Sequence, residues 1–149
     1  MTITVRIATG HDIDTVFEIR TSVRQNHLSR EQLAEMGITP EALLDAIDGG
    51  DARIWIAEMD GAAAAFAMAD ADEGTVFAMF VRPQYEGRGL GRLLMQEAEA
   101  FLFARKELIW LVTDAASEIR ANGFYQRLGW RQAGAIVDGD IRYEKTAGK

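Results

Sequence analysis

The sequence predicts an α+β fold, in which helices flank a mixed, mostly antiparallel β-sheet that contains one central βαβ crossover. Three observations carry this prediction. Apolar and polar residues alternate with the period of a strand in residues 3–7. Three further strand-like segments, joined by short turns, occupy residues 54–81. A glycine-rich loop, an amphipathic helix and an apolar strand follow in residues 82–112, so the strands on either side of the helix should be parallel neighbours.

Length and composition favour one domain that spans residues 1–149. A chain of 149 residues can bury a sizeable core, and its 48% hydrophobic and 26% charged residues are ordinary for a soluble globular protein. No apolar run is long enough to span a membrane, and residues 1–6 have no signal-peptide pattern. We therefore expect a cytoplasmic protein without a membrane partner.

Net charge and cysteine content argue against several kinds of partner and site. The formal net charge of −7 argues against nucleic acid as the main partner. The chain has no Cys, and His11 and His27 are its two histidines. We therefore expect no disulfide, no thiolate nucleophile and no metal site.

The first third of the chain is expected to hold one strand and three helices. Residues 3–7 form the strand, and Thr9 with Asp12 forms a capping box for the first helix, which should end near residues 25–27. Ser29 and Thr39 begin two shorter helices in the same way. The expected apolar faces are Ile13, Val16, Phe17 and Val23, flanked by Ile19 and Arg20; Leu33 and Met36; and Leu43, Leu44 and Ile47.

The rest of the chain returns to strands. Residues 54–59, 62–69 and 75–81 form an antiparallel meander, with a hairpin turn at Asp60 and Gly61. The apolar run 108–112 is expected to be a strand buried on both faces. A further helix (117–128) and two strands (130–137 and 141–145, joined at Asp138 and Gly139) complete the order. The long helix after the loop presents an apolar stripe of Leu90, Leu93, Leu94, Ala98, Phe101 and Leu102. Glu97 and Glu99 of this helix, and Glu107 just beyond it, are expected to face solvent.

The stretch from Val81 to Leu94 is the feature around which the chain is organised. It places several backbone N–H groups at a helix N-terminus without side-chain cover, which is a favourable site for an anion such as a phosphate. A dinucleotide fingerprint needs a third Gly where Arg92 stands, and a P-loop needs a Gly-Lys-Ser/Thr ending that is missing here. The remaining alternative from the residues alone is a loop whose glycines only ease the turn into the helix.

This stretch resembles motif A of the GNAT family of acyl-CoA N-acyltransferases, in which Arg/Gln-x-x-Gly-x-Gly/Ala wraps the coenzyme A pyrophosphate. Residues 86–91 (EGRGLG) fill the motif, with Glu86 where Arg or Gln is usual. Residues 84–89 match the formula literally, but the later register places Leu93 and Leu94 on the buried helix face. The Glu is tolerable if backbone donors bind the pyrophosphate, and Arg88 and Arg92 offset its charge.

A second segment strengthens the resemblance. Residues 120–130 (RANGFYQRLGW) look like the family's Ala-x-x-Phe-Tyr signature followed by Gly-Trp, although Glu118 stands where many members carry Asn. The predicted order of strands and helices also matches the family over almost the whole chain. The chain is therefore identified as a member of the GNAT family, with an N-acetyltransferase fold.

The resemblance implies acetyl-CoA as co-substrate and direct attack of a primary amine on its thioester. Tyr125 is the family's general acid for the coenzyme thiolate; a phenol of pKa about 10 can protonate a thiolate of pKa about 8.5. The residues implied in coenzyme binding are Met79, Phe80 and Val81, through main-chain groups freed by a bulge, together with Glu86, Gly87, Arg88, Gly89, Leu90, Gly91 and Arg92. Asn26 and His27 fall where the family builds its acceptor pocket. The expected acceptor is a small-molecule or peptide amine. A homodimer is compatible with the resemblance.

Several assignments stay open at the level of the sequence. The general base could be Glu73, Asp114, His27 or a water chain, since residues 75–81 contain no carboxylate. Tyr125 could serve only to pack its helix, and His27 could be a surface residue at a helix end. Trp55 and Trp110 could shape the acceptor pocket. The functional alternatives are a non-catalytic acyl-CoA-binding sensor or interaction domain and a structural domain without a ligand.

Overall fold

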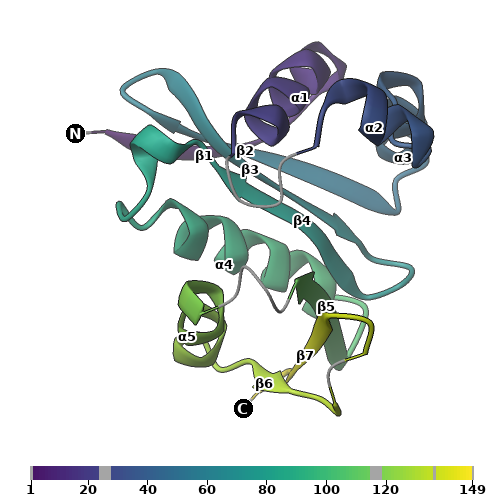
Figure 1. The fold of residues 1–149 in the computed structure, drawn as a ribbon, viewed down its shortest axis with the longest axis vertical. Helices are drawn as coiled ribbons and strands as arrows, with labels where there is room; N and C mark the ends of the chain where they lie inside the picture. Colours follow the sequence, from purple (N-terminus) through teal and green to yellow (C-terminus); the bar gives the residue numbers. More distant parts are fainter. Residues whose placement is uncertain (1, 24–27, 115–118, 136, 149) are drawn as a thin grey trace.

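A computed structural model describes residues 2–23, 28–114, 119–135 and 137–148 (Figure 1). The described residues form one mixed sheet in the order β1-β2-β3-β4-β5-β7-β6, in which β4 and β5 are the parallel pair. Helices cover both faces, which confirms the predicted α+β class with its central crossover. The strands are β1 (Ile3–Ile7), β2 (Ala52–Met59), β3 (Ala62–Asp70), β4 (Thr75–Val81), β5 (Leu108–Asp114), β6 (Arg131–Gln132) and β7 (Asp140–Thr146). The helices are α1 (Ile13–Ser22), α2 (Arg30–Glu35), α3 (Pro40–Asp48), α4 (Leu90–Phe103) and α5 (Ile119–Arg127), with short 3₁₀ turns η1 (Gly10–Asp12) and η2 (Pro83–Tyr85).

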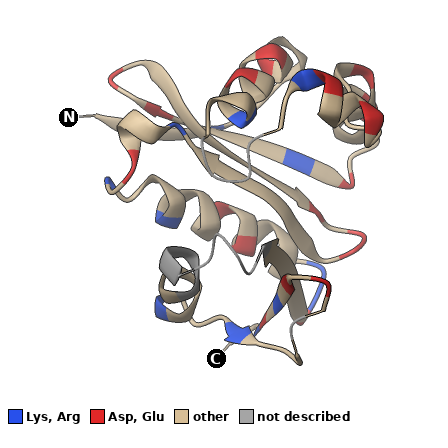
Figure 2. Cartoon of the chain, viewed as in Figure 1, with Lys and Arg blue, Asp and Glu red and all other residues tan. Residues whose placement is uncertain are grey.

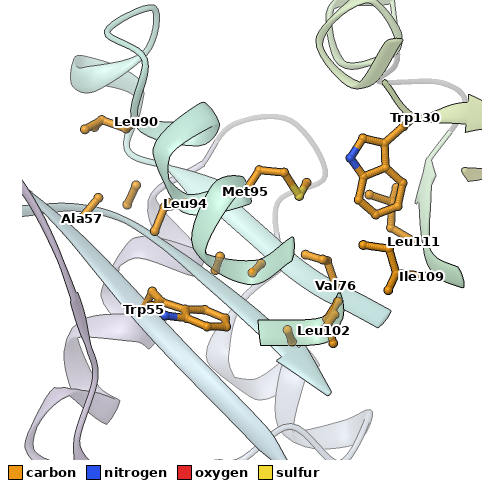
Figure 3. Close-up of a cluster of buried hydrophobic side chains, with 14 of the residues drawn as sticks. Trp55, Ala57, Val76, Leu90, Leu94, Met95, Leu102, Ile109, Leu111 and Trp130 are labelled. Atoms are coloured by element: carbon orange, nitrogen blue, oxygen red, sulfur yellow. The ribbon is translucent and has the colours of Figure 1, made fainter. Parts of the chain in front are cut away.

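Two apolar clusters separate the helices into two layers. Helices α1, α2 and α3 pack over β2, β3 and β4 on one face of the sheet, around Ile56 and Phe66. Helix α4 packs on the opposite face, where Leu94, Met95 and Leu102 meet Trp55 and strand residues from the centre of the sheet (Figure 3). Helix α4, which is the crossover between the parallel strands β4 and β5, therefore covers this face at the centre of the sheet.

Local signals in the sequence fix most of the turns and helix starts. The side chains of Thr9, Ser29 and Thr39 accept hydrogen bonds from first-turn amides of the helices that they precede. The Asp60–Gly61 turn has positive φ at both residues (52° and 85°), which is the backbone that a tight hairpin turn with the twist of its strands requires. Among the described helices, none is long and apolar enough to cross a bilayer.

Some predicted boundaries and faces are wrong. Helix α1 ends at Ser22, before residues 25–27, and Ile19 is fully buried on it instead of flanking the apolar face. Strand β6 is two residues long, where residues 130–137 were expected. In β5, Leu108 and Val112 are 41% and 48% exposed, so this strand is covered on one face only. The reason is that the layer of α1, α2 and α3 lies over β2, β3 and β4 and does not extend over β5.

Candidate functional site

The parallel pairing of β4 and β5 stops almost where it begins. Its register consists of the single pair Thr75 and Trp110, reinforced by a hydrogen bond from the Trp110 amide to the Gly74 carbonyl (3.0 Å) and one from the Thr75 hydroxyl to the Trp110 carbonyl (2.8 Å). Beyond this pair the two strands diverge (Figure 1). We call the edge of residues 76–81 that faces β5 the split edge of β4. Its backbone groups are not engaged in a ladder with the described part of β5.

A bulge decides which backbone groups point to the split edge. Ala69 pairs with Val76 and Met68 with Ala78, so Phe77 is an extra residue in β4. Beyond it the Arg82 amide donates to the Ala64 carbonyl of β3 (2.8 Å). Successive peptide groups of a strand alternate between its two neighbours.

It follows that Met79 and Val81 direct both amide and carbonyl toward the split edge, whereas Phe80 pairs with Phe66 of β3. The bulge had been expected within Met79, Phe80 and Val81; it lies two residues before Met79. Of the main-chain groups of Met79, Phe80 and Val81, those of Met79 and Val81 are the ones that face this edge. The backbone groups of Phe80 point to β3 instead. The extra residue at the bulge decides which of the following residues face β3 and which face the split edge.

The glycine loop connects this edge to helix α4. Gly87 and Gly89 have φ of +75° and +83°, and Gly89 is the N-cap of α4 without a side-chain cap. A Cβ at either glycine would have no neighbouring atom within 4 Å, so the loop backbone faces open space. The first-turn amides of Leu90, Gly91 and Arg92 therefore have no side-chain acceptor at the N-cap.

The charges at the start of α4 are the reverse of those that a helix start normally favours. No acidic residue lies in its first turn, whereas Arg92 occupies the third helical position and Arg88 precedes the helix. Figure 2 shows the basic colour at this end of α4 and both signs on the preceding loop, where Glu86 lies exposed. Positive charge beside the positive end of a helix is unfavourable unless an anion joins it.

Gly91 has a different role from the other two glycines of the loop. A Cβ there would lie 3.2 Å from Cζ of Phe124 and 3.9 Å from Sδ of Met79. Its absence lets α5 approach the first turn of α4 closely. Phe124 and the side chain of Met79 therefore both lie near the first turn of α4.

Tyr125 lies half-buried between α5 and the C-terminal strands. Its ring centroid is 5.4 Å from that of Phe124, 6.5 Å from that of Trp130 and 5.2 Å from that of Tyr143. The Trp130 amide donates to the Tyr125 carbonyl (3.0 Å), which fixes the end of α5 on the sheet. Tyr125 thus packs α5 against the C-terminal strands and also belongs to the apolar cluster that includes α4.

A partly buried polar cluster that the sequence did not indicate links α4 to the end of α5 and to β7. Glu99 of α4 was expected on a solvated face, but its side chain is 17% exposed. Its carboxylate accepts hydrogen bonds from Nε1 of Trp130 (3.0 Å) and from Nζ of Lys145 (2.8 Å), and Lys145 also donates to the Leu128 carbonyl (2.6 Å). The periodicity of α4 cannot reveal this role, because both partners of Glu99 come from distant segments. Glu97 and Glu107 are exposed as predicted.

Of the residues considered as the general base, the structure describes the side chain of Glu73 alone. Asn26, His27 and Glu118 lie outside the described residues, as does the side chain of Asp114 at the end of β5. Glu73 lies in the turn before β4, at the opposite end of that strand from the glycine loop. No general base is assigned among the described residues.

The two tryptophans that were considered for the acceptor pocket have structural roles. Trp55 is 2% exposed and packs edge-on against Phe101, with ring centroids 5.5 Å apart. Trp110 donates from Nε1 to the Glu73 carbonyl (3.0 Å) and lies beneath the guanidinium of Arg142 (4.6 Å). It therefore fixes the paired end of β4 and β5. The described residues contain no group of three metal-ligating side chains.

Two surface hollows lie away from the glycine loop. One, of about 510 Å³, is lined by Trp55, Phe101 and Arg53 between α4 and β2. The other, of about 470 Å³, lies between Val112 of β5 and the β6–β7 connection, on the sheet face opposite α4.

Comparison with known proteins agrees with the geometry. Residues 50–132 match the model of the acetyltransferase (GNAT) domain, and no curated protein sequence matches the chain. Among solved structures, the PaiA N-acetyltransferase of Thermoplasma acidophilum in complex with coenzyme A has 18% identity, covers 98% of this chain and 99% of its own, and has a TM-score of 0.82. The ribosomal-protein-S18-alanine N-acetyltransferase of Escherichia coli has 22% identity, covers 97% and 94%, and has a TM-score of 0.75.

A chimeric spermidine N-acetyltransferase from Vibrio cholerae has 15% identity, covers 98% of this chain and 96% of its own, and has a TM-score of 0.74. At such identities the structures show a shared fold. The family model covers more than half of the chain, from the end of α3 through the glycine loop and α5 to β6. This chain belongs to the GNAT family of acetyltransferases.

Proposed function

We propose that residues 1–149 act as one N-acetyltransferase domain, which binds acetyl-CoA at the split edge of β4 and transfers the acetyl group to a primary amine. The observation that carries the proposal is the start of α4. Its N-cap is a glycine without a side-chain cap, and its loop backbone faces open space. Its first turn holds Arg92 and no acidic residue, and Arg88 lies just before the N-cap. These features suit the pyrophosphate of coenzyme A. The presence of coenzyme A in the solved structure of the Thermoplasma relative, which has the same fold, supports this choice of ligand.

The residues available at the split edge suit the remainder of the co-substrate. The backbone groups of Met79 and Val81 are unpaired with β5 and can bind the amide-containing arm of the coenzyme. One of these amides can donate to the carbonyl oxygen of the thioester, which gains negative charge during attack. Bound acetyl-CoA supplies the activated acetyl group as a thioester. The attacking amine forms the new C–N bond and gives up one proton to solvent water, and the C–S bond breaks to release a thiolate.

Tyr125 is the proposed proton donor to that thiolate. It lies on α5, next in sequence to Phe124. Because Gly91 has no side chain, α5 can approach the start of α4 closely at Phe124. The phenol of a tyrosine is protonated at neutral pH, so it can donate its proton to the thiolate as the C–S bond breaks. The acceptor is a small-molecule or peptide amine; relatives of the fold act on a ribosomal-protein alanine and on spermidine.

Binding and transfer are tested separately. Acetyl-CoA at 100 times its Kd should stabilise the protein by about 2.7 kcal/mol, measured as a rise in melting temperature. A thiol-release assay with a panel of amines then measures transfer. Stabilisation without transfer to any amine would identify a non-catalytic acyl-CoA-binding sensor. Absence of stabilisation would contradict the proposed coenzyme site.

A further inference from the structure

Glu99, Trp130 and Lys145 form a cluster at the C-terminal end of α5, which we call the Glu99 cluster. Each carboxylate oxygen of Glu99 has its own donor, because Oε1 accepts from Nζ of Lys145 (2.8 Å) and Oε2 from Nε1 of Trp130 (3.0 Å). The two charged side chains are 17% and 18% exposed, so solvent screens their attraction less than on the open surface. The carboxylate is therefore held in one orientation by two donors from distant segments.

The Glu99 cluster also binds the main chain at the end of α5. Nζ of Lys145 donates to the carbonyl of Leu128, the residue that follows the last residue of α5. Carbonyls at a helix C-terminus lack partners within the helix and lie at the negative end of its dipole, so an ammonium group stabilises them. A Cβ added at Gly129 would lie 3.4 Å from Cε of Lys145, which shows how closely the lysine stem packs on this turn. Lys145 therefore links the turn after α5 to the carboxylate on α4.

Tyr125 is the residue whose position depends on this end of α5. Its carbonyl accepts hydrogen bonds from the amides of Leu128 (3.1 Å) and Trp130 (3.0 Å). Its ring meets the Trp130 ring edge-on, at an angle of 61° and a centroid distance of 6.5 Å. The indole of Trp130 is in turn fixed by its hydrogen bond to Glu99. A change at Glu99 therefore reaches Tyr125 through both the main chain and the ring of Trp130.

The charges of the cluster contribute direction more than net stability. A shielded ion pair adds little to the free energy of unfolding, because the loss of hydration offsets most of the attraction between the charges. Charged hydrogen bonds differ from apolar contacts in that they fix the geometry of both partners. Geometry is the requirement for a proton donor, which acts only within hydrogen-bond reach of the atom that it protonates.

We propose that Glu99 is a positioning residue, which holds Tyr125 in the orientation that lets its hydroxyl donate a proton to the coenzyme thiolate. The proposal rests on the proposed N-acetyltransferase function and adds a residue to its mechanism. The effect of Glu99 passes through Trp130 and Lys145, so it requires no contact between Glu99 and the substrate.

The test removes the charge of Glu99 and keeps the size of its side chain. In Glu99→Gln, kcat in the thiol-release assay should fall at least about tenfold, because a small misplacement of a reacting group strongly lowers the rate. The Kd for acetyl-CoA should stay within about twofold of the wild-type value, since the lost interaction belongs to the chemical step. Lys145→Gln, which keeps a donor for the Leu128 carbonyl, should also lower kcat. Melting temperatures report whether each variant is folded.

Glu97→Gln is the matched control. Glu97 lies two residues earlier on α4 and is exposed, so the substitution makes the same change of charge on the same helix without touching the Glu99 cluster. It should leave both kcat and the Kd for acetyl-CoA unchanged.

A double-mutant cycle separates positioning of Tyr125 from a general structural effect. If Glu99 acts through the Tyr125 hydroxyl, Glu99→Gln should lower kcat by less than about twofold when Tyr125→Phe is already present. A structural effect elsewhere in the site would lower kcat by the same factor in both backgrounds. Such additivity in folded proteins, or a wild-type kcat in Glu99→Gln, would overturn the role given to Glu99.

A spectroscopic measurement tests the positioning without turnover. The chain has three tyrosines, so incorporation of fluorotyrosine gives three fluorine NMR resonances, which single Tyr→Phe variants assign. Glu99→Gln should shift or broaden the Tyr125 resonance and leave that of Tyr85, in η2, unchanged, whereas Glu97→Gln should alter neither. An unchanged Tyr125 resonance in Glu99→Gln would overturn the proposal.

Other failures would count against the proposed function instead. They are the absence of stabilisation by acetyl-CoA, the absence of transfer to every amine, and a wild-type kcat in Tyr125→Phe. In each of these cases the fluorine resonances still decide whether Glu99 holds Tyr125 in place.

Discussion

Substitution of Gly89 by Ala should weaken coenzyme binding at least as much as it weakens the fold. Gly89 has φ +83° at the N-cap of α4, a region that costs a residue with a Cβ about 1–2 kcal/mol. For a chain of 149 residues this corresponds to a fall in melting temperature of roughly 2–8 °C. Relief of the strain by rotation at Gly89 would turn first-turn amides away from the bound pyrophosphate. Loss of one charge-assisted hydrogen bond costs about 1.5–3 kcal/mol, or roughly 10- to 150-fold in Kd.

Gly61 provides the matched control for this substitution. Its φ is +85° in the β2–β3 turn, and like Gly89 it has no atom within 4 Å of an added Cβ. Gly61→Ala should lower the melting temperature by a similar amount and leave the Kd for acetyl-CoA unchanged in isothermal titration calorimetry. Equal affinities for wild type and Gly89→Ala, or equal losses in the two variants, would refute the role given to the α4 start.

Three further predictions address catalysis, the loop charge and stability. Tyr125→Phe should lower kcat on the order of 100-fold in a thiol-release assay and change the Kd for acetyl-CoA little; unchanged kcat with chemistry rate-limiting would remove Tyr125 from the mechanism. Glu86→Gln should leave that Kd unchanged or lower it by calorimetry, since backbone donors bind the pyrophosphate, and a tenfold loss of affinity would show that the carboxylate is needed. The hydrogen bond from Arg6 (2.8 Å) lowers the pKa of Asp12 from 3.8 to about 2, so its stabilisation is complete above pH 3.8 and is lost as the pH falls toward 2. Arg6 is 42% exposed, so the difference in unfolding free energy between wild type and Asp12→Asn should be only about 1 kcal/mol by urea titration at pH 7; a difference that does not shrink at pH 3 would contradict the assignment.

Local sequence signals predicted the elements that position the site. Strand β4 has the predicted bounds, and the long helix begins at Leu90 as its apolar stripe indicated. These predictions succeed because a proline, two glycines and a 3.6-residue period act over a few residues. The proposed coenzyme loop could therefore be found without coordinates.

Features that depend on distant segments could not be predicted. The apolar run of β5 predicted a strand buried on both faces, but Val112 is exposed. The run itself cannot show that the helices α1, α2 and α3 on that face stop at β4. The bulge at Phe77 depends on register against β3. Glu99 is largely shielded from solvent because Trp130 and Lys145, from distant segments, bind its carboxylate.

The central claim is that the start of α4 and the split edge of β4 together bind acetyl-CoA, and a crystal structure of the protein with coenzyme A tests it most directly. We predict the pyrophosphate within about 2.7–3.2 Å of amide nitrogens between Gly87 and Arg92, with the coenzyme arm hydrogen-bonded to main-chain groups of Met79 or Val81. A coenzyme bound with its pyrophosphate on any other element, or with its arm away from β4, would contradict the account.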